Sequence, residues 1–363
     1  MKILFIHPSV ELYGADKILL YILEILHSKN DITILLPKEG ILVNKIKEIS
    51  QSIKIVVNEE LPIVHSKLGI KDYFQIPFRL KKFFKLFHKN EFDLIYCNTL
   101  ATVLLLFTKW SKKKVIHVHE IISNKFINFG FSVLIRLNTK NVICVSKHVK
   151  YNLFFSKTYK TIHNGIPDNA GFYRENIISD KIIFSLPGRF MPQKGQWFVI
   201  EALKELSETE LKKIEIRMFG SPPPNRIFLG DELRNLIKKY KLENFVKLFD
   251  FTQNISEIYE QANIILVPSM MSDPFPTTVL EALEFSRPVI STNHGGASEI
   301  LDSSCSVLIN PGNKEELASA IRFFINNNSL IKEYSLNARN KYEGTLSLDI
   351  FKEKLLTYLE QNK

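Results

Sequence analysis

Short apolar runs alternate with segments of helical periodicity from the first residue of the chain. In the first half, a helix is predicted from Ala15 to about His27, and strands are predicted at Lys2–His7, Asp31–Leu36, Asp93–Asn98, Lys114–Val118 and Asn141–Val145. Strands that alternate with helices in this order favour a parallel sheet with both faces covered. The first half is therefore predicted to form one α/β domain.

The alternation restarts in the second half of the chain. The strands predicted there are Ile182–Leu186, Ile214–Phe219, Val246–Phe249, Ile264–Val267, Val289–Ser291 and Val307–Ile309. Between the two sets lies the segment HNGIPD, residues 163–168, whose Asn-Gly and Pro-Asp pairs form turns. We therefore expect two Rossmann-like domains, residues 1–168 and 169–346. Because parallel sheets bind ligands beyond the carboxyl ends of their strands, the two sheets are expected to face a central cleft.

The composition fits two folded domains without a membrane span. A chain of 363 residues suits two domains of roughly 150 residues each, and no apolar run approaches the ~20 residues that a spanning helix needs. The N-terminus, MKILFIHPSV, lacks the small-residue cleavage site of a signal peptide, so we expect a cytoplasmic protein. The cysteines, Cys97, Cys144 and Cys305, lack metal-ligand spacing.

The net charge of +10 is concentrated in the first half. Residues 1–170 hold 25 Lys and Arg against 13 Asp and Glu, whereas the remainder holds 23 against 25. This asymmetry favours an anionic surface or acceptor beside the N-terminal half, and the alternative is lysine that serves only solubility. No RNA- or DNA-binding signature accompanies the basic residues, so nucleic acid is not an expected partner.

One segment of the basic half, FQIPFRLKKFFKLFHK at residues 74–89, has the composition of an interfacial anchor. After Pro77 its apolar residues mostly follow helical spacing, and basic residues without any acid fill the other positions. A basic amphipathic helix with phenylalanine on its apolar face is typical of segments that lie on anionic membranes. A helix packed on the core, with its basic face in solvent, is the alternative interpretation.

The strongest chemical signal runs from Gln261 to Ile300. A loop that holds Asp273 follows a predicted strand, and Thr277 or Thr278 is predicted to N-cap a helix that carries Glu281 in its first turn. The amides of such a helix start can hold a diphosphate, and a carboxylate can accept both hydroxyls of a ribose. The alternative is structural: Asp273 caps a turn and Glu281 is a favourable first-turn acid.

A second segment, LPGRFMPQKG at residues 186–195, brings two cations to the end of a strand. Arg189 lies in the loop, and Lys194 comes just before a helix expected to begin near Gly195. Arginine as a fork and lysine as a point charge suit a pyrophosphate. The pattern is not a P-loop. Further along the chain, Gly295-Gly296 would let the backbone approach a ligand closely.

The first half adds two weaker candidates. Gly14, in ELYGADK, follows the first strand and opens a helix. In VIHVHE, His117 and His119 point to the same side of a strand, and the strand end favours His119, with a buried core histidine as the alternative.

Together these segments resemble glycosyltransferase family 4, the retaining GT-B enzymes. That family carries a Glu, seven residues and a second Glu, then a strand with proline and a Gly-Gly turn; here the pair is Asp273 and Glu281, so the first carboxylate is one methylene shorter. The resemblance implies that Glu281 binds the nucleotide ribose and that Asp273 lies near the donor sugar. It also implies that His119 faces that sugar. In GT-B proteins the last helix, here 347–363, crosses back to the first domain.

The resemblance also gives the remaining site residues their expected roles. Arg189 and Lys194 would bind the diphosphate and stabilise the leaving group, and Gly14 would stand for the family's glycine-rich loop. The predicted donor-binding set is completed by Phe275, Pro276, Thr277 and Thr278. No cofactor is expected beyond a UDP- or GDP-linked sugar as substrate, and no metal, because no suitable DxD motif ends a strand. A carbohydrate or lipid-linked oligosaccharide is the expected acceptor, in cell-surface polysaccharide assembly.

Three other functions compete with this interpretation. Sugar-nucleotide epimerases and phosphorylases share the fold class, and a non-catalytic membrane-associated protein would use only the basic half. A nicotinamide-dependent oxidoreductase needs GxGxxG after the first strand, where this chain has only Gly14. Turnover of a nucleotide sugar without an acceptor would favour the epimerase or phosphorylase.

Overall fold

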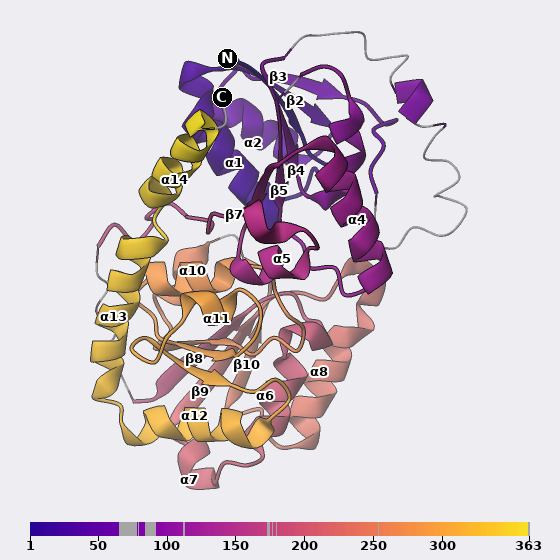
Figure 1. The fold of residues 1–363 in the computed structure, drawn as a ribbon. Coiled ribbons are helices and arrows are strands. Elements are labelled where there is room, and N and C mark those ends of the chain that lie inside the picture. The colour runs from indigo at the N-terminus through magenta and orange to yellow at the C-terminus, as the bar shows by residue number, and fades with distance from the viewer. Residues whose placement is uncertain are drawn as a thin grey trace. The chain divides into compact units, whose positions relative to one another are not determined.

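The chain folds into two compact units, which Figure 1 shows as ribbons. The structure is a computed structural model that describes residues 1–64, 78, 80–83, 92–111, 113–172, 175, 177–178, 180–252 and 254–361. Unit 1 comprises Met1–Gly165 with Leu348–Lys363, and unit 2 comprises Ile166–Ser347. The change of unit thus falls at Gly165, three residues before the boundary expected from the turn-forming segment.

Unit 1 is built on a seven-stranded parallel sheet with the order β3-β2-β1-β4-β5-β6-β7. Its strands are β1 (Lys2–Ile6), β2 (Asp31–Leu36), β3 (Lys54–Val57), β4 (Leu94–Asn98), β5 (Lys114–Val118), β6 (Asn141–Cys144) and β7 (Lys160–Thr161). Its helices are α1 (Gly14–Leu26), α2 (Ile41–Ile49), α4 (Lys125–Asn138), α5 (Lys147–Asn152) and α14 (Leu348–Gln361), with 3-10 turns at His27–Lys29, Leu100–Phe107 and Ser156–Thr158. The order reverses between β1 and β4, which is where doubly wound sheets bind ligands.

The C-terminal helix α14 completes the core of unit 1. Phe351 and Leu355 are fully buried in one hydrophobic cluster with residues of β1, β2 and α1. Figure 1 shows α14 beside α1, and the two helices are in contact. A segment from the far end of the chain therefore supplies part of the first domain's core.

Unit 2 repeats the design with a six-stranded parallel sheet in the order β10-β9-β8-β11-β12-β13. Its strands are β8 (Ile182–Pro187), β9 (Ile214–Phe219), β10 (Val246–Phe249), β11 (Ile264–Val267), β12 (Val289–Thr292) and β13 (Ser306–Ile309). Its helices are α6 (Gln196–Leu203), α7 (Glu208–Leu211), α8 (Phe228–Lys239), α9 (Ile255–Tyr259), α10 (Thr277–Glu284), α11 (Ala297–Ile300), α12 (Lys314–Asn326) and α13 (Leu330–Thr345), with 3-10 turns at Pro192–Lys194 and Pro224–Arg226.

Two strands were not predicted from the sequence, and both lie at an edge of the unit 1 sheet. The strand β3 pairs only with β2, and its residues are half-buried or exposed. The strand β7 contains two residues. Edge strands of this kind lack the continuous apolar run that marks a central parallel strand, so the sequence pattern is weak there.

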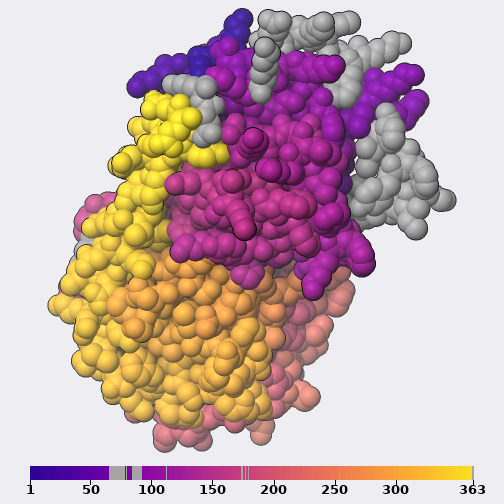
Figure 2. Space-filling view, viewed as in Figure 1, coloured from indigo at the N-terminus to yellow at the C-terminus, as the bar shows by residue number. Residues whose placement is uncertain are grey.

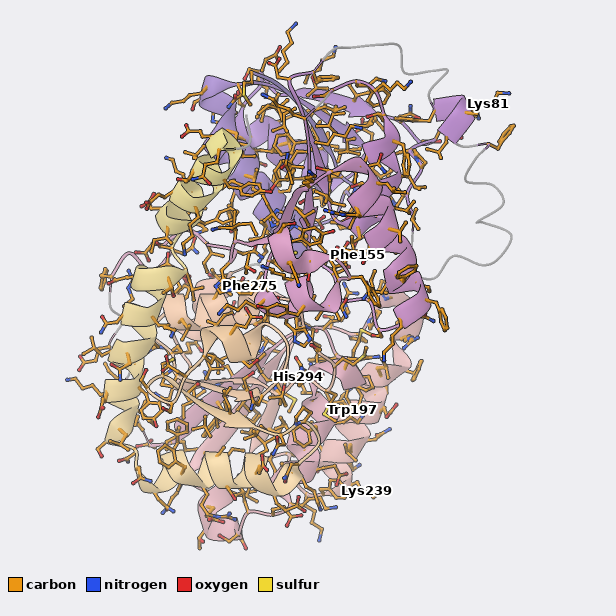
Figure 3. The ribbon with its side chains drawn as sticks, in the orientation of Figure 1. Lys81, Phe155, Trp197, Lys239, Phe275 and His294 are labelled. Carbon is orange, nitrogen blue, oxygen red and sulfur yellow. The ribbon has the colours of Figure 1, made fainter. Side chains whose placement is uncertain are left out.

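The predicted basic helix at residues 74–89 lies largely outside the described residues, which include Phe78 and residues 80–83 of it. Within that part, Phe83 is fully buried and its ring lies 5.6 Å from the ring of Trp110. Lys82 forms an ion pair with Glu60, and Lys81 is exposed (Figure 3). Membrane contact through this segment stays a prediction. Among the described residues, no helix is long and apolar enough to cross a membrane.

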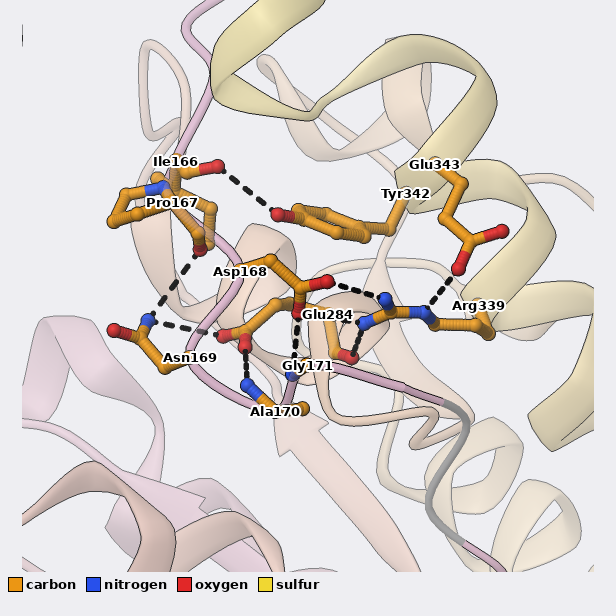
Figure 4. A network of polar contacts seen from close by, with 10 residues as sticks. All are labelled: Ile166, Pro167, Asp168, Asn169, Ala170, Gly171, Glu284, Arg339, Tyr342 and Glu343. Carbon is orange, nitrogen blue, oxygen red and sulfur yellow. Dashed lines mark hydrogen bonds and ion pairs between the residues drawn. The ribbon is translucent and has the colours of Figure 1, made fainter.

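A polar network ties the first residues of unit 2 to its last helix (Figure 4). The Ile166 amide donates to the carbonyl of Leu346 at 3.1 Å, and the Tyr342 hydroxyl donates to the Ile166 carbonyl at 3.1 Å. Arg339, whose side chain is buried, donates through two nitrogens to Asp168. The places where the chain enters and leaves unit 2 are thereby held side by side.

Glu284 of α10 belongs to the same network from the other side. Its carboxylate accepts from the Ala170 amide at 2.6 Å and from the Asn169 side chain at 3.4 Å. Burial raises the pKa of the Glu284 carboxyl to about 7, although the hydrogen bond from Ala170 opposes that shift. The folded protein therefore binds this proton more tightly than the unfolded chain does.

The Glu284 network predicts a pH dependence of stability. Because the pKa in the folded state lies above its ordinary value of 4.5, the stabilisation is full below pH 4.5 and is lost as pH rises through about 7. We expect the free energy of unfolding of unit 2 to fall by about 2–3 kcal/mol between pH 5 and pH 8, relative to Glu284→Gln. Trp197 fluorescence in a Trp110→Phe background would report on unit 2 alone. Equal pH slopes in the two proteins would contradict the assignment.

Candidate active site

The loop after β8 is fixed at both ends by contacts that the local sequence provides. The Gln196 side chain, at the start of α6, donates to the carbonyls of Gly188 at 3.2 Å and of Arg189 at 3.1 Å. Gly195 has φ +86°, and a Cβ at that position would lie 2.1 Å from the carbonyl oxygen of Pro268. The loop that carries Arg189 and Lys194 is thus pressed against the loop after β11.

Lys194 and Asp273, which are far apart in the sequence, meet where these two loops touch. The Met270 amide donates to the Gln193 carbonyl at 2.9 Å, and the Lys194 ammonium lies 3.3 Å from a carboxylate oxygen of Asp273. Both side chains stay partly open to solvent, at 41% for Lys194 and 28% for Asp273. Arg189, in the same loop, is exposed. A cation and a carboxylate therefore stand together at the carboxyl edge of the unit 2 sheet.

Asp273 also makes the turn contact that the structural alternative predicts. Its other carboxylate oxygen accepts from the Phe275 amide at 3.3 Å, while the first oxygen faces Lys194. The turn and the ion pair therefore coexist, one on each oxygen. The turn contact needs only a hydrogen-bond acceptor, whereas the ion pair needs a negative charge. The substitution Asp273→Asn therefore keeps the first and removes the second.

The helix α10 begins differently from the prediction. Thr277 and Thr278 are its first two residues, the N-cap is Pro276, and no side chain caps the helix. The predicted threonine cap is therefore wrong, because the helix starts one residue earlier than a capping threonine requires. Proline ahead of the first turn has no amide to satisfy, and the first amides of α10 have no side-chain cap. Such a start is suited to an anion.

Glu281 lies in the second turn of α10, not in the first as predicted. The Tyr259 hydroxyl donates to one of its carboxylate oxygens at 2.7 Å. Burial raises the pKa of that phenol well above its usual range, so Tyr259 stays a hydrogen-bond donor. This contact from α9 orients Glu281, and the sequence pattern around Glu281 did not reveal it.

The other predicted donor-binding residues of this loop differ in what they can present. The side chains of Phe275 and Pro276 are buried, so their backbone is what a ligand could reach. Thr277 and Thr278 are half-buried, and their hydroxyls stand at the start of α10. The loop thus combines an apolar anchor with polar groups beside the helix amides.

Gly295 and Gly296 serve this loop directly. The Gly296 amide donates to the Asp273 carbonyl at 2.8 Å, and Gly295 has φ +64°. A Cβ on Gly295 would lie 2.4 Å from that carbonyl oxygen, and one on Gly296 would lie 2.3 Å from the carbonyl oxygen of Pro274. The close backbone approach that the Gly-Gly pair predicts is therefore an approach to the Asp273 loop.

In unit 1, the structure distinguishes the two candidate histidines of β5. His117 is fully buried, its Nδ1 lies 2.9 Å from the Tyr96 hydroxyl, and burial lowers its pKa to about 3. His119 follows the end of β5 and is half-buried. Burial, and then the neighbouring His117 and His7, hold the pKa of His119 well below its usual range. His119 is thus a neutral group near the carboxyl edge of the sheet, and His117 belongs to the core.

A hydrogen-bonded chain links His119 to the start of α1. The His119 Nε2 lies 3.0 Å from the Asn98 side-chain oxygen, and the Asn98 amide nitrogen lies 2.9 Å from Nδ1 of His7. Nε2 of His7 lies 2.6 Å from the Asp16 carboxylate, one turn into α1. All three bonds are satisfied when both histidines are neutral and carry the proton on Nε2. This chain fixes the orientation and tautomer of His119.

The sequence interpretation missed three members of that chain: His7, Asn98 and Asp16. Each had a weak signal, because His7 and Asn98 are polar residues at the ends of apolar strands, and Asp16 is an acid in the first turn of a helix. Gly14 opens α1 as predicted, and its neighbour Tyr13 is the N-cap. The first turn of α1 therefore carries both Gly14 and the acid that orients the histidine chain.

Metal ligands are not gathered in the part of the chain that the structure describes. Among those residues, no three His, Cys, Asp or Glu side chains group in a way that could hold a metal ion. The cysteines Cys97, Cys144 and Cys305 are buried and unpaired in disulfides.

The two parallel-sheet, Rossmann-like units give the chain the GT-B fold. Its structure is similar to the crystal structure of Anabaena HepE in complex with UDP, with a TM-score of 0.83 and 21% sequence identity over 99% of this chain and 100% of that one. Residues 172–341, nearly all of unit 2, match the family model described as glycosyl transferases group 1. The matched residues include Arg189, Lys194, Asp273 and Glu281, on which the sequence resemblance to glycosyltransferase family 4 rests.

Curated proteins similar to the chain include two that are named as glycosyltransferases. The chain is 36% identical over 132 residues to an uncharacterized glycosyltransferase of Methanocaldococcus jannaschii, MJ1059, an alignment that covers 35% of this chain and 30% of that protein. It is 24% identical over 315 residues to the capsular polysaccharide biosynthesis glycosyltransferase CapH of Staphylococcus aureus, covering 81% of this chain and 84% of CapH. The alignments with two other relatives, SCO2592 of Streptomyces coelicolor and MJ1178 of M. jannaschii, cover 18% and 54% of the length of those proteins.

Proposed function

We propose that the protein is a retaining glycosyltransferase that moves a hexosyl group from a UDP- or GDP-linked donor to an acceptor hydroxyl. The observation that carries this proposal is the meeting of Lys194 and Asp273 beside the uncapped start of α10. A cation and free helix amides suit a diphosphate, and an adjacent carboxylate suits the polar face of the attached sugar.

In the proposed reaction, the acceptor oxygen forms a bond to the anomeric carbon while the bond from that carbon to the phosphate oxygen breaks. The electron pair of the broken bond goes to the departing nucleoside diphosphate, and the acceptor proton goes to its phosphate on the same face of the sugar. Lys194, Arg189 and the first amides of α10 stabilise the charge that develops on the diphosphate. Position and electrostatics then supply the acceleration.

The other residues take supporting roles in this proposal. Glu281, oriented by Tyr259, accepts the ribose hydroxyls. His119 carries its proton on Nε2 toward Asn98, so it offers Nδ1 as an acceptor to a hydroxyl of the donor sugar. The first turn of α1, with Gly14, presents backbone to the donor. When the donor is bound, Lys194 contacts the diphosphate instead of Asp273, and the Asp273 carboxylate then faces the sugar.

Relatives support the place of this reaction in polysaccharide assembly. HepE has been crystallised with UDP, and CapH is named for capsular polysaccharide biosynthesis. We therefore propose a nucleotide sugar as donor, and a carbohydrate or a lipid-linked oligosaccharide as acceptor, with the protein on the cytoplasmic side of a membrane. The basic segment at residues 74–89 is one proposed contact with that membrane.

The proposal is tested by incubating the purified protein with a panel of nucleotide sugars and measuring released nucleotide. We expect release from one donor, dependent on an acceptor, and unchanged when a chelator removes divalent metals, because Arg189, Lys194 and the helix amides take the place of a metal. Strict dependence on Mg²⁺ or Mn²⁺ would contradict the proposed site. Consumption of the donor without an acceptor would indicate an epimerase or hydrolytic enzyme, and binding without turnover would indicate a non-catalytic protein.

A further inference from the structure

Four phenylalanine side chains lie exposed on two neighbouring segments of unit 1. Phe126 and Phe129 are on α4, and Phe154 and Phe155 follow α5; their exposed fractions are 90%, 49%, 40% and 50%. The ring of Phe129 lies 5.5 Å from that of Phe154 and 6.1 Å from that of Phe155. We call these four residues the phenylalanine cluster; Figure 3 labels Phe155 within it.

The cluster is held on a fixed support. The side chain of Asn128, buried on the inner side of α4, donates to the Asn152 carbonyl at 2.8 Å. The Ser132 hydroxyl, also buried, accepts from the Phe154 amide at 3.0 Å. Buried polar side chains of α4 thus hold the last residue of α5 and the backbone of Phe154 after it.

The backbone at Phe155 adds a second observation. This residue adopts the left-handed conformation, with φ 61° and ψ 21°, which is costly for a residue with a bulky side chain. Half of its side chain is exposed, so packing in the core does not offset this cost. Strain at a residue that stays half exposed is a reason to look for a function of its side chain.

The stretch of sequence that carries the cluster holds charges of one sign. Between Glu120 and Asp168 the sequence contains no acidic residue, and its basic residues are Lys125, Arg136, Lys140, Lys147, Lys150, Lys157 and Lys160. Lys125 precedes Phe126, and Lys157 follows Phe155 by two residues; both are exposed. The magenta part of unit 1, drawn in Figure 2, includes this stretch. Exposed aromatic rings beside cations without acids complement an anionic, apolar partner.

We propose that the phenylalanine cluster inserts into an anionic lipid bilayer, with Lys125 and Lys157 at the headgroups. Phenylalanine has no polar group to keep at the water boundary, and lysine next to it is attracted by anionic headgroups. A carbohydrate fits less well, because the rings are inclined at 86°, 53° and 51° to one another and offer no flat platform for a sugar.

The location of the cluster relates this inference to the proposed function. The helix α4 follows the end of β5, where His119 lies, and the Phe154–Phe155 segment follows β6 and α5. Docking here would bring the carboxyl edge of the unit 1 sheet to the lipid surface, where a lipid-linked acceptor is presented. The inference rests on the proposed function only for that purpose, since lipid binding is measured without turnover.

The experiment is flotation of the full chain with two kinds of vesicle, phosphatidylcholine alone and phosphatidylcholine with about 30% phosphatidylglycerol. We expect binding to the anionic vesicles that weakens with salt. Phe126→Ser with Phe155→Ser should weaken that binding at least about tenfold, because apolar area is no longer buried. Lys125→Glu with Lys157→Glu should weaken it by at least a similar factor.

A matched control is available in unit 2, where Phe228 and Phe251 are exposed at 60% and 69%. Their replacement by serine should leave vesicle binding unchanged. Phe126→Trp gives a spectroscopic readout of the same site, for which we expect a blue-shifted emission with anionic vesicles only. Circular dichroism of each variant would show that the fold is kept.

Four outcomes would overturn the proposal. Equal vesicle binding by the wild type and by the Phe126→Ser/Phe155→Ser variant would exclude the cluster, and loss of binding through Lys81→Glu/Lys82→Glu alone would assign it to the segment at 74–89. A raised KM for the acceptor with unchanged vesicle binding would make the cluster an acceptor site. A concentration-dependent dimer that the serine variant abolishes would make it an interface between two copies of this chain. Failure of the nucleotide-release assay would leave the flotation result unaffected.

Discussion

Replacing Lys194 by alanine is expected to lower turnover by roughly 10²–10³-fold, and Arg189→Ala should have an effect of the same order. Both cations are proposed to stabilise charge that appears on the diphosphate only as the sugar leaves, so the loss should fall mainly on kcat. Initial rates of nucleotide release, with and without saturating donor, would measure it. The fold should be kept, because exposed ion pairs such as Lys194–Asp273 contribute about 1 kcal/mol or less.

The same unit offers a matched control for Lys194. Lys204 pairs with Glu201 at 3.1 Å, and its side chain is 40% exposed, against 41% for Lys194. Lys204→Ala removes a comparable lysine that follows the end of α6 and lies outside the two site loops, so activity should stay near the wild-type value. An equal loss of turnover in the two variants would point to a general effect of lost charge and would remove Lys194 from the proposed site.

The second large effect is expected at the carboxylates of Asp273 and Glu281. One substitution should lower mainly turnover, and the other should weaken mainly nucleotide binding. Asp273→Asn keeps an acceptor for the Phe275 amide but removes the charge that is proposed to face the donor sugar, so turnover should fall severely with little change in nucleotide affinity. Glu281→Ala should instead weaken nucleotide binding by about 2–3 kcal/mol, since two charge-assisted hydrogen bonds to the ribose disappear. Steady-state kinetics and calorimetry on both variants would measure the two quantities.

Each carboxylate variant has a result that contradicts its assignment. Near-wild-type kinetics for Asp273→Asn would leave Asp273 as a turn-forming residue only. Unchanged nucleotide affinity for Glu281→Ala would show that Tyr259 holds that carboxylate for structural reasons. Tyr259→Phe is the positioning control, because it removes the hydroxyl that orients Glu281 while the ring stays stacked on Phe285. We expect it to weaken nucleotide affinity less than Glu281→Ala does.

Much of the fold could be predicted from the sequence, because central parallel strands are buried on both faces and form continuous apolar runs. The predicted strands at Asp31–Leu36, Lys114–Val118, Ile214–Phe219, Val246–Phe249 and Ile264–Val267 have the observed bounds, and the other predicted strands differ by one residue at one end. The edge strands β3 and β7 were missed for the opposite reason. Local capping preferences predict a threonine as the N-cap of α10. In the structure the N-cap is Pro276.

The candidate site also has residues that the sequence indicates and contacts that only the structure shows. Loops that end strands, with cations, carboxylates and glycines at short spacing, can be found in the sequence, so Arg189, Lys194, Asp273 and Glu281 were candidates without coordinates. Their partners could not be found, because Tyr259 contacts Glu281 from a different helix. A contact between segments far apart in the chain leaves no periodic signal in either segment.

The sequence by itself therefore determined the two α/β units, the order of most elements and the loops that hold the candidate chemistry, since these depend on hydrophobic period and turn chemistry along the chain. Only the tertiary structure decided that the Gly-Gly turn supports the Asp273 loop and that His7 orients His119 through Asn98. It also decided that Glu284 is buried under the segment that enters unit 2. Each of these depends on which side chains share a buried space, and burial is set by packing between elements.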